Sequence, residues 1–245
     1  MSPYDNPICV ALDTPELERA VELATALKGE VGFVKVGLEF FYAHGHAGYD
    51  RVARCGVPVF LDLKLHDIPN TVAGGLRSLM RLPVPPAIVN VHAAGGPAML
   101  KAAREAVDEA PADARPKLIA VTVLTSLDAL DLASIGYDVS EGVAGQALRM
   151  AELVAGSGLD GVVCSPAEVS EMRRQFGAHF MTVVPGIRPA NAETGDQKRI
   201  ATPGETIRAG AHILVIGRPI TGAADPVKAA RAIREEIEFA REAAV

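Results

Sequence analysis

Two aspartates and one lysine lie close together in the segment 59–71. Asp62 and Lys64 are two residues apart, and Asp67 follows three residues after Lys64. A cluster of this kind can fix the position of one ammonium group and change its pKa, as active sites require. The alternative is a surface strand with a salt-bridged polar face. A solvated face, however, does not need two carboxylates around one ammonium group.

The residues around this cluster alternate between apolar and polar in the manner of a β-strand. Successive side chains on a strand point to opposite faces, so Asp62 and Lys64 share one face and the intervening leucines share the other. Proline and asparagine, which are typical turn residues, follow in the segment 68–70. We therefore predict a strand over 57–64 and a turn just beyond it, with Asp67 between the two.

Eight short apolar segments alternate along the chain with segments of helical periodicity. This alternation favours a parallel sheet with crossover helices. Eight units in 245 residues fit one closed (β/α)8 barrel, an α/β fold, as a single domain over 1–245. An open doubly wound sheet is the alternative, but its GxGxxG motif does not follow the first strand. The expected strands are 8–12, 32–36, 57–64, 87–91, 117–124, 161–164, 180–184 and 212–216.

The composition limits the classes of protein to which the chain can belong. Hydrophobic residues make up 49% and charged residues 22%, which indicates a globular protein. Aromatic residues make up only 4% and the net charge is −6, and both values weigh against a nucleic-acid partner. No signal-peptide pattern and no apolar run of transmembrane length occurs, so we expect a cytoplasmic protein that does not bind membranes.

The cysteines and histidines do not have the spacing of a metal site. Cys9, Cys55 and Cys164 contain no CxxC pair, so we expect neither a zinc site nor a disulfide framework. His44 and His46 are two residues apart, with no carboxylate at a suitable spacing. We therefore predict that the histidines are structural and that the protein holds no metal.

Most of the remaining polar candidates follow the predicted strands. In a (β/α)8 barrel the carboxyl ends of the strands form the active site, so residues after different strands meet at one mouth. Gly217 and Arg218 after the last strand are typical of a phosphate site, because glycine allows close approach and arginine is a forked donor. The candidates at this mouth are Asp13, Lys35, Asp62, Lys64, Asp67, Thr125, Arg188, Gly217 and Arg218.

A long polar segment, 190–204, follows the seventh predicted strand and contains Gln197. It is longer than most connections between a strand and a helix, and loops of this length often close over a ligand. We therefore predict a lid in this segment. A surface loop without a function is the alternative interpretation.

These motifs together resemble the orotidine 5′-phosphate decarboxylase family. Residues 62–71, DLKLHDIPNT, are similar to the family signature DxKxxDIPNT. The resemblance implies a homodimeric barrel that converts orotidine 5′-phosphate to UMP and carbon dioxide, the last step of UMP biosynthesis, without a metal or an organic cofactor. It also implies that Asp67 and Thr71 reach the active site of the neighbouring subunit. The other matching segments, in the expected order, are 12–13, 34–37, 91–93, 124–126, 185–188, Gln197 and 217–218.

The resemblance also implies roles for individual residues. Lys64 would stabilise the carbanion that develops at C6 of the pyrimidine and then donate a proton to it. Asp62 and Asp67 would favour the charged form of Lys64, whereas Lys35 would oppose it. Lys35 and Asp13 would hold the ribose hydroxyls. The other expected substrate contacts are Gln197, Gly217 and Arg218 at the phosphate, Thr125, Pro185 and Arg188 around the pyrimidine, and Ile68.

Two other functions remain open. One is that of a metal-dependent relative on the same barrel, a decarboxylase or aldolase that acts on a phosphorylated sugar acid or ketose. It shares the Asp-x-Lys-x-x-Asp core but has an acidic metal ligand where this chain has Lys35, and it lacks the continuation 68–71. The other is a barrel that senses a nucleotide without catalysis, which would have no need for Lys35, Asp62, Lys64 and Asp67 together.

Overall fold

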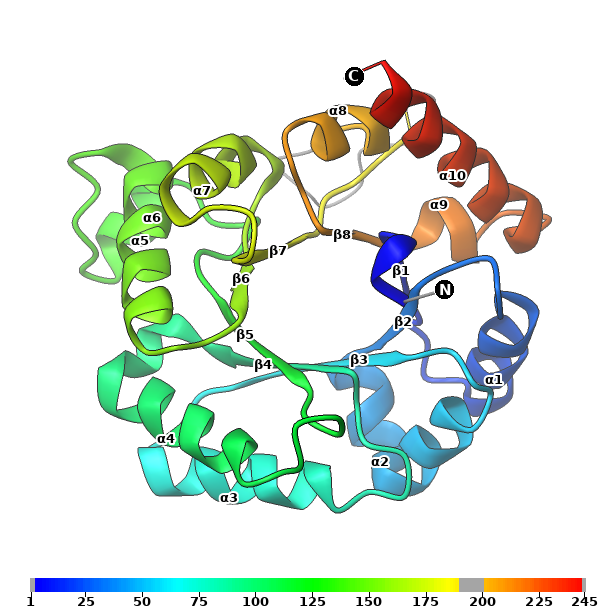
Figure 1. Cartoon of the computed structure of the whole chain (residues 1–245), viewed down its shortest axis with the longest axis horizontal. Coiled ribbons are helices and arrows are strands. Elements are labelled where there is room, and N and C mark those ends of the chain that lie inside the picture. Colours follow the sequence, from blue (N-terminus) through cyan, green and yellow to red (C-terminus); the bar gives the residue numbers. More distant parts are fainter. Residues whose placement is uncertain (1–2, 190–200, 244–245) are drawn as a thin grey trace.

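The computed structural model describes residues 3–189 and 201–243. Eight parallel strands in these residues close into a barrel, in which each strand pairs with the next and the eighth pairs with the first. Figure 1 shows the strands as an inner ring with the helices around it. The predicted (β/α)8 barrel is therefore confirmed, and the open sheet is excluded.

Each strand lies within its predicted segment or extends it by one residue. The prediction was too long for the fifth strand, which ends at Val121, so that Thr125 lies in the loop beyond it. The strands are β1 (Ile8–Ala11), β2 (Phe33–Val36), β3 (Val59–Leu65), β4 (Ile88–His92), β5 (Lys117–Val121), β6 (Gly161–Val163), β7 (Met181–Val184) and β8 (Ile213–Ile216).

Helices cover the outside of the barrel (Figure 1). None of those in the described residues combines the length and the apolar character that a membrane span requires, and the cytoplasmic location stays a prediction. The helices are α1 (Leu17–Ala26), α2 (Leu38–Ala53), α3 (Pro69–Met80), α4 (Gly96–Asp108), α5 (Ala129–Ser134), α6 (Gly142–Gly156), α7 (Val169–Phe176), α8 (Pro203–Arg208), α9 (Arg218–Thr221) and α10 (Pro226–Glu242), with short 3-10 turns at Pro3–Asp5, Ala93–Gly95 and Pro166–Glu168.

Helix α8 begins inside the segment that was predicted to be a polar loop. The Thr202 hydroxyl accepts a hydrogen bond from the backbone N–H of Glu205, and the Glu205 carboxylate accepts one from the backbone N–H of Thr202. This reciprocal capping, with Pro203 in the first turn, starts a helix without a long periodic pattern. The predicted loop therefore ends at Thr202, and its part 190–200 lies outside the described residues.

Alternate residues of each strand face the barrel interior or the surrounding helices. Phe33, Phe60 and Ile88 of three neighbouring strands belong to an apolar cluster inside the barrel. Val34 and Leu61 belong to the larger core between the barrel and the helices. The alternation predicted for β3 is thus confirmed. The same interior face continues two positions later on each of these strands, with Lys35, Asp62 and Asn90.

Candidate active site

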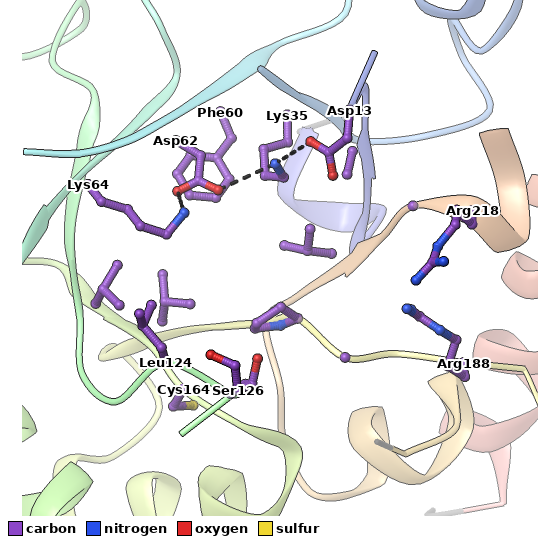
Figure 2. Close-up of a pocket in the computed structure, with 18 of the residues that line it drawn as sticks. Asp13, Lys35, Phe60, Asp62, Lys64, Leu124, Ser126, Cys164, Arg188 and Arg218 are labelled. Atoms are coloured by element: carbon purple, nitrogen blue, oxygen red, sulfur yellow. Dashed lines mark hydrogen bonds and ion pairs between the residues drawn. The ribbon is translucent and has the colours of Figure 1, made fainter. Parts of the chain in front are cut away.

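The carboxyl ends of the strands surround a pocket of about 660 Å³ (Figure 2). Nine of the thirteen predicted site residues line this pocket, and they come from six different strands or the loops after them. This is the end of the barrel at which (β/α)8 enzymes build their active sites. The nine are Asp13, Lys35, Asp62, Lys64, Thr125, Pro185, Arg188, Gly217 and Arg218.

Lys35, on β2, lies between two carboxylates. Its Nζ is 2.9 Å from Asp13 Oδ1 and 3.4 Å from Asp62 Oδ2. Burial alone would lower the pKa of Lys35, but the carboxylates of Asp62 and Asp13 outweigh it and raise the pKa above its usual value. Lys35 is therefore an ammonium group at neutral pH, which can donate hydrogen bonds but cannot act as a base.

Asp62 is the centre of the charged cluster. Its Oδ1 accepts a hydrogen bond from Lys64 Nζ at 2.7 Å, and its Oδ2 faces Lys35 (Figure 2). Burial alone would raise the pKa of Asp62, but the two ammonium groups and the hydrogen bonds from Lys64 and Asn90 hold it below its usual value. Asp62 is therefore charged although it is buried, and the order of charges along the pocket wall is cation, anion, cation.

Lys64 departs from the regular strand that was predicted. Its φ is 51°, and among the described residues it is the only non-glycine residue with a positive φ. The pairing of β3 with β4 also shifts register between Leu61 and Leu65. A positive φ is uncommon outside glycine, and such conformations concentrate at functional sites. The end of β3 is thus a bulge that carries the lysine of the cluster.

Two arginines lie at the other side of the pocket from Lys64 (Figure 2). Arg188 follows β7, and Arg218 is the first residue of α9, directly after Gly217. Figure 2 shows their guanidinium groups pointing towards each other. Two forked cations at one end of a pocket suit an anion such as a phosphate. The site is therefore elongated, with a place for an anion at one end and the charged cluster at the other.

Three of the predicted site residues that the structure describes do not line this pocket. Asp67, Ile68 and Thr71 are exposed at the start of α3, and the Asp67 carboxylate accepts a hydrogen bond from the backbone N–H of Ile68 at 2.6 Å. Within the described residues, no ion pair joins Asp67 to Lys64. Gln197 lies outside the described residues. Asp67 is close to Lys64 in the sequence, but it therefore does not line the pocket of its own chain.

Asn90 and Ser126 were not predicted to belong to the site. The Asn90 side chain donates to Asp62 and accepts from the backbone N–H of Lys64. An amide in the middle of an apolar strand needs buried partners, and that signal could have identified it. Ser126 lines the pocket beside Thr125 in the loop after β5. The signal that could have identified Ser126 is the pair of hydroxyl residues, Thr125 and Ser126, after the fifth strand.

Several histidines contact neighbouring parts of the chain. His44 Nε2 lies 2.6 Å from the carbonyl oxygen of Pro15, and His92 stacks on His66. In the part of the chain that the structure describes, no three His, Cys, Asp or Glu side chains are arranged to hold a metal ion. Independence of a metal or other cofactor stays a prediction.

The chain is similar over nearly its whole length to proteins of one family. A model described as the "Orotidine 5′-phosphate decarboxylase / HUMPS family" matches residues 6–233. Orotidine 5′-phosphate decarboxylase of Rhodospirillum rubrum is 53% identical over 236 residues, which cover 95% of this chain and 94% of that protein. The protein of the same name from Novosphingobium aromaticivorans is 54% identical over 228 residues, or 93% of this chain and 97% of that protein.

A solved structure agrees with this relationship. The crystal structure of orotidine 5′-phosphate decarboxylase from Lactobacillus acidophilus matches with a TM-score of 0.82 and 39% identity. The match covers 95% of this chain and 99% of that chain. The fold, the pocket at the strand ends and these similarities lead to one conclusion: the chain belongs to the orotidine 5′-phosphate decarboxylase family.

Proposed function

We propose that the protein converts orotidine 5′-phosphate to UMP and carbon dioxide, the last step of UMP biosynthesis, with Lys64 as the proton donor to C6. The chain is an enzyme of this carboxy-lyase family, and relatives named for the activity are more than half identical to it. The observation that carries the proposal is the charged cluster of Lys35, Asp62 and Lys64, which faces two arginines across the pocket.

The charged cluster suits the difficult step of this reaction. Loss of carbon dioxide leaves a carbanion at C6, a ring carbon with little conjugation. A positioned cation stabilises such a charge and can then supply the proton. Lys64 lines the pocket with 31% of its side chain exposed, and Asp62 holds its Nζ at 2.7 Å. Lys64 is therefore the group that we assign to this step.

The other end of the pocket suits the phosphate of the substrate. Arg218 and the backbone at Gly217 would bind the phosphate, and Gln197 is proposed as a further phosphate contact. Lys35 and Asp13, which are joined at 2.9 Å, would bind the ribose hydroxyls between the phosphate and the base. The proposed contacts of the pyrimidine are Thr125 and Pro185, whereas Arg188, which lies beside Arg218 on the side of the pocket opposite Lys64, is proposed to bind the phosphate.

The reaction is tested by following the loss of orotidine 5′-phosphate absorbance with purified protein in EDTA. Turnover in EDTA would support the proposed reaction and its independence of a divalent metal. Turnover that appears only after a divalent metal is added would indicate the metal-dependent relative instead. Binding of the nucleotide without turnover under either condition would indicate a sensor.

We also propose that the protein is a homodimer in which Asp67 and Thr71 reach the pocket of the partner. Their position supports this proposal, because both are exposed and lie outside the pocket of their own chain. The exposed side chain of Ile68 between them is apolar and would be buried in such an interface.

Mixed dimers test this arrangement. Lys64→Ala and Asp67→Ala should each be inactive alone. In a hybrid dimer, one of the two pockets would combine an intact Lys64 with the partner's intact Asp67. Random mixing of equal amounts makes about half of the dimers hybrids, so it should restore about a quarter of the wild-type activity. No recovery in a sample whose hybrid dimers are verified by native mass spectrometry would show that Asp67 does not act across the interface.

A further inference from the structure

We propose that Asn90 is a positioning residue for the decarboxylation, which acts through Asp62 and Lys64 rather than by touching the substrate. The inference rests on the proposed function, because Asn90 would fix the direction in which Lys64 faces the substrate. Asn90 lies at the centre of β4, behind the residues that line the pocket, and only 1% of its surface is exposed. Any effect on the reaction must therefore pass through its neighbours.

Both ends of the Asn90 amide contact the charged cluster. Its nitrogen donates to Asp62 Oδ1 at 2.7 Å, and its oxygen accepts from the backbone N–H of Lys64 at 2.8 Å. The partners fix this orientation, because an ionised carboxylate can only accept and a backbone N–H can only donate. Asp62 Oδ1 also accepts from Lys64 Nζ at 2.7 Å. One amide thus holds both the carboxylate that fixes the ammonium group and the backbone that carries it.

The backbone of Lys64 needs this partner because β3 bulges at that point. Between the β4 pairings of Leu61 and Leu65, three residues of β3 lie opposite Asn90 alone. A bulge interrupts the ladder of backbone hydrogen bonds and changes the direction of nearby side chains. The side-chain oxygen of Asn90 accepts a hydrogen bond from the backbone N–H of Lys64, the residue whose φ is 51°. Without that acceptor, the bulge could relax and turn the Nζ of Lys64 away from the substrate.

An amide at this position destabilises the barrel unless both of its ends are used. Ile88, two residues earlier on the same face of β4, packs in the apolar interior cluster. A buried amide without partners is unfavourable, and an apolar residue would fill the position without that penalty. Among the described residues, the side chain of Asn90 forms hydrogen bonds only with Asp62 and Lys64. The position is therefore matched to the cluster rather than to the general packing of the barrel.

Two substitutions test the proposal. Asn90→Ala removes both contacts, whereas Asn90→Asp keeps an oxygen for the Lys64 N–H and replaces the donor to Asp62 with a second carboxylate. We expect kcat to fall about 10- to 100-fold in both, as a displacement of reacting groups by roughly 1 Å would cause. KM and the affinity for UMP should change less than about threefold, because Asn90 is remote from the phosphate end. Asn90→Asp, which keeps the side-chain volume, decides the question if Asn90→Ala does not fold.

Thr182 provides a matched control. Its side chain is fully buried on β7, accepts from the backbone N–H of His212 at 3.3 Å and lies 3.1 Å from His212 Nδ1. It thus joins two neighbouring chain segments, as Asn90 does, but it lies in the first half of its strand, whereas the pocket lies beyond the last residue of that strand. We expect Thr182→Val to lower the Tm and to leave kcat unchanged.

The outcomes separate this inference from the function on which it rests. A kcat within about twofold of wild type in both Asn90 variants would overturn the inference, and so would a loss of UMP affinity as large as the loss of kcat. A comparable loss of kcat in Thr182→Val would also overturn it, because general destabilisation would then explain the effect. Wild-type protein that fails to turn over orotidine 5′-phosphate would overturn the proposed function itself.

Discussion

Replacement of Asp62 by asparagine should destabilise the folded protein more than the same change at Asp13. Both carboxylates pair with Lys35, Asp13 at 2.9 Å and Asp62 at 3.4 Å, so distance alone would rank Asp13 first. Burial reverses the order, because the side chain of Asp13 is 60% exposed and that of Asp62 is 11% exposed. Exposed pairs contribute about 0–1 kcal/mol, whereas removal of one partner from a buried pair costs about 3–5 kcal/mol.

The distances around Asp62 set the size of the expected loss. With an effective dielectric constant of about 20, unit charges at the 3.4 Å of Lys35 and the 2.7 Å of Lys64 attract Asp62 by roughly 5 and 6 kcal/mol. Desolvation cancels much of this gross attraction. In Asp62→Asn, Lys35 keeps Asp13 and Lys64 can turn towards water, so we expect a net loss of about 3 kcal/mol. For a chain of this size, this corresponds to a Tm lower by about 6–12 °C.

The pH dependence of stability gives a second measure of the same effect. The pKa of Asp62 is below its usual value in the folded protein, so its ionised form stabilises the fold. This contribution is fully present above the pKa of an unfolded aspartate, about 3.9, and is lost as the pH falls through the lower pKa of the folded state. The difference between wild type and Asp62→Asn should therefore be complete at neutral pH and shrink below about pH 4.

Urea unfolding followed by circular dichroism, with wild type, Asp62→Asn and Asp13→Asn side by side, measures these differences. Asp13→Asn should lose less than about 1 kcal/mol at neutral pH. An Asp62→Asn variant as stable as wild type would refute the reasoning, since the ion pairs would then not offset the desolvation of the cluster. Equal losses in the two variants would show that burial does not determine the strength of these pairs.

Two further predictions concern the phosphate end and the barrel itself. Arg218→Ala should lower kcat as well as raise KM, because binding energy at the phosphate can act on the distant reacting group. Loss of a charge-assisted contact of about 1.5–3 kcal/mol corresponds to a kcat/KM lower by roughly 10- to 150-fold. Steady-state kinetics that show a raised KM but an unchanged kcat would contradict the predicted effect on kcat. Gly161→Ala should lose about 3 kcal/mol or more in denaturant unfolding, because its Cβ would lie 2.0 Å from the backbone oxygen of Met181. A loss below about 1 kcal/mol would mean that β6 and β7 separate easily.

The barrel could be predicted because its signals are local. Each strand is an apolar run between turn residues, and the alternation through Phe60 and Leu61 shows which side chains face the interior. Neither signal depends on contacts with distant residues. Helix α8 was missed because its signal is the reciprocal capping of Thr202 and Glu205 rather than a periodic run.

A residue's position in the pocket could be predicted where it follows from a place at a strand end, as for Lys35 and Arg218. Asn90 could not be found in this way, because its partners are 26 and 28 residues away and are brought to it by the register of β3 against β4. The bulge at Lys64 has no local pattern that distinguishes it from a regular strand. The place of Asp67 likewise depends on the direction of the backbone after β3, which sequence proximity to Lys64 does not encode.

The proposed donation of a proton by Lys64 is tested most directly by the turnover of orotidine 5′-phosphate by Lys64→Ala, measured beside its affinity for UMP and its Tm. We expect a folded variant that binds UMP nearly as well as wild type, because the residues proposed to bind phosphate and ribose are intact. Its kcat should be lower by more than about 10³-fold, since both the stabilising cation and the proton donor are lost. A Lys64→Ala variant with kcat within about tenfold of wild type would contradict the role of Lys64.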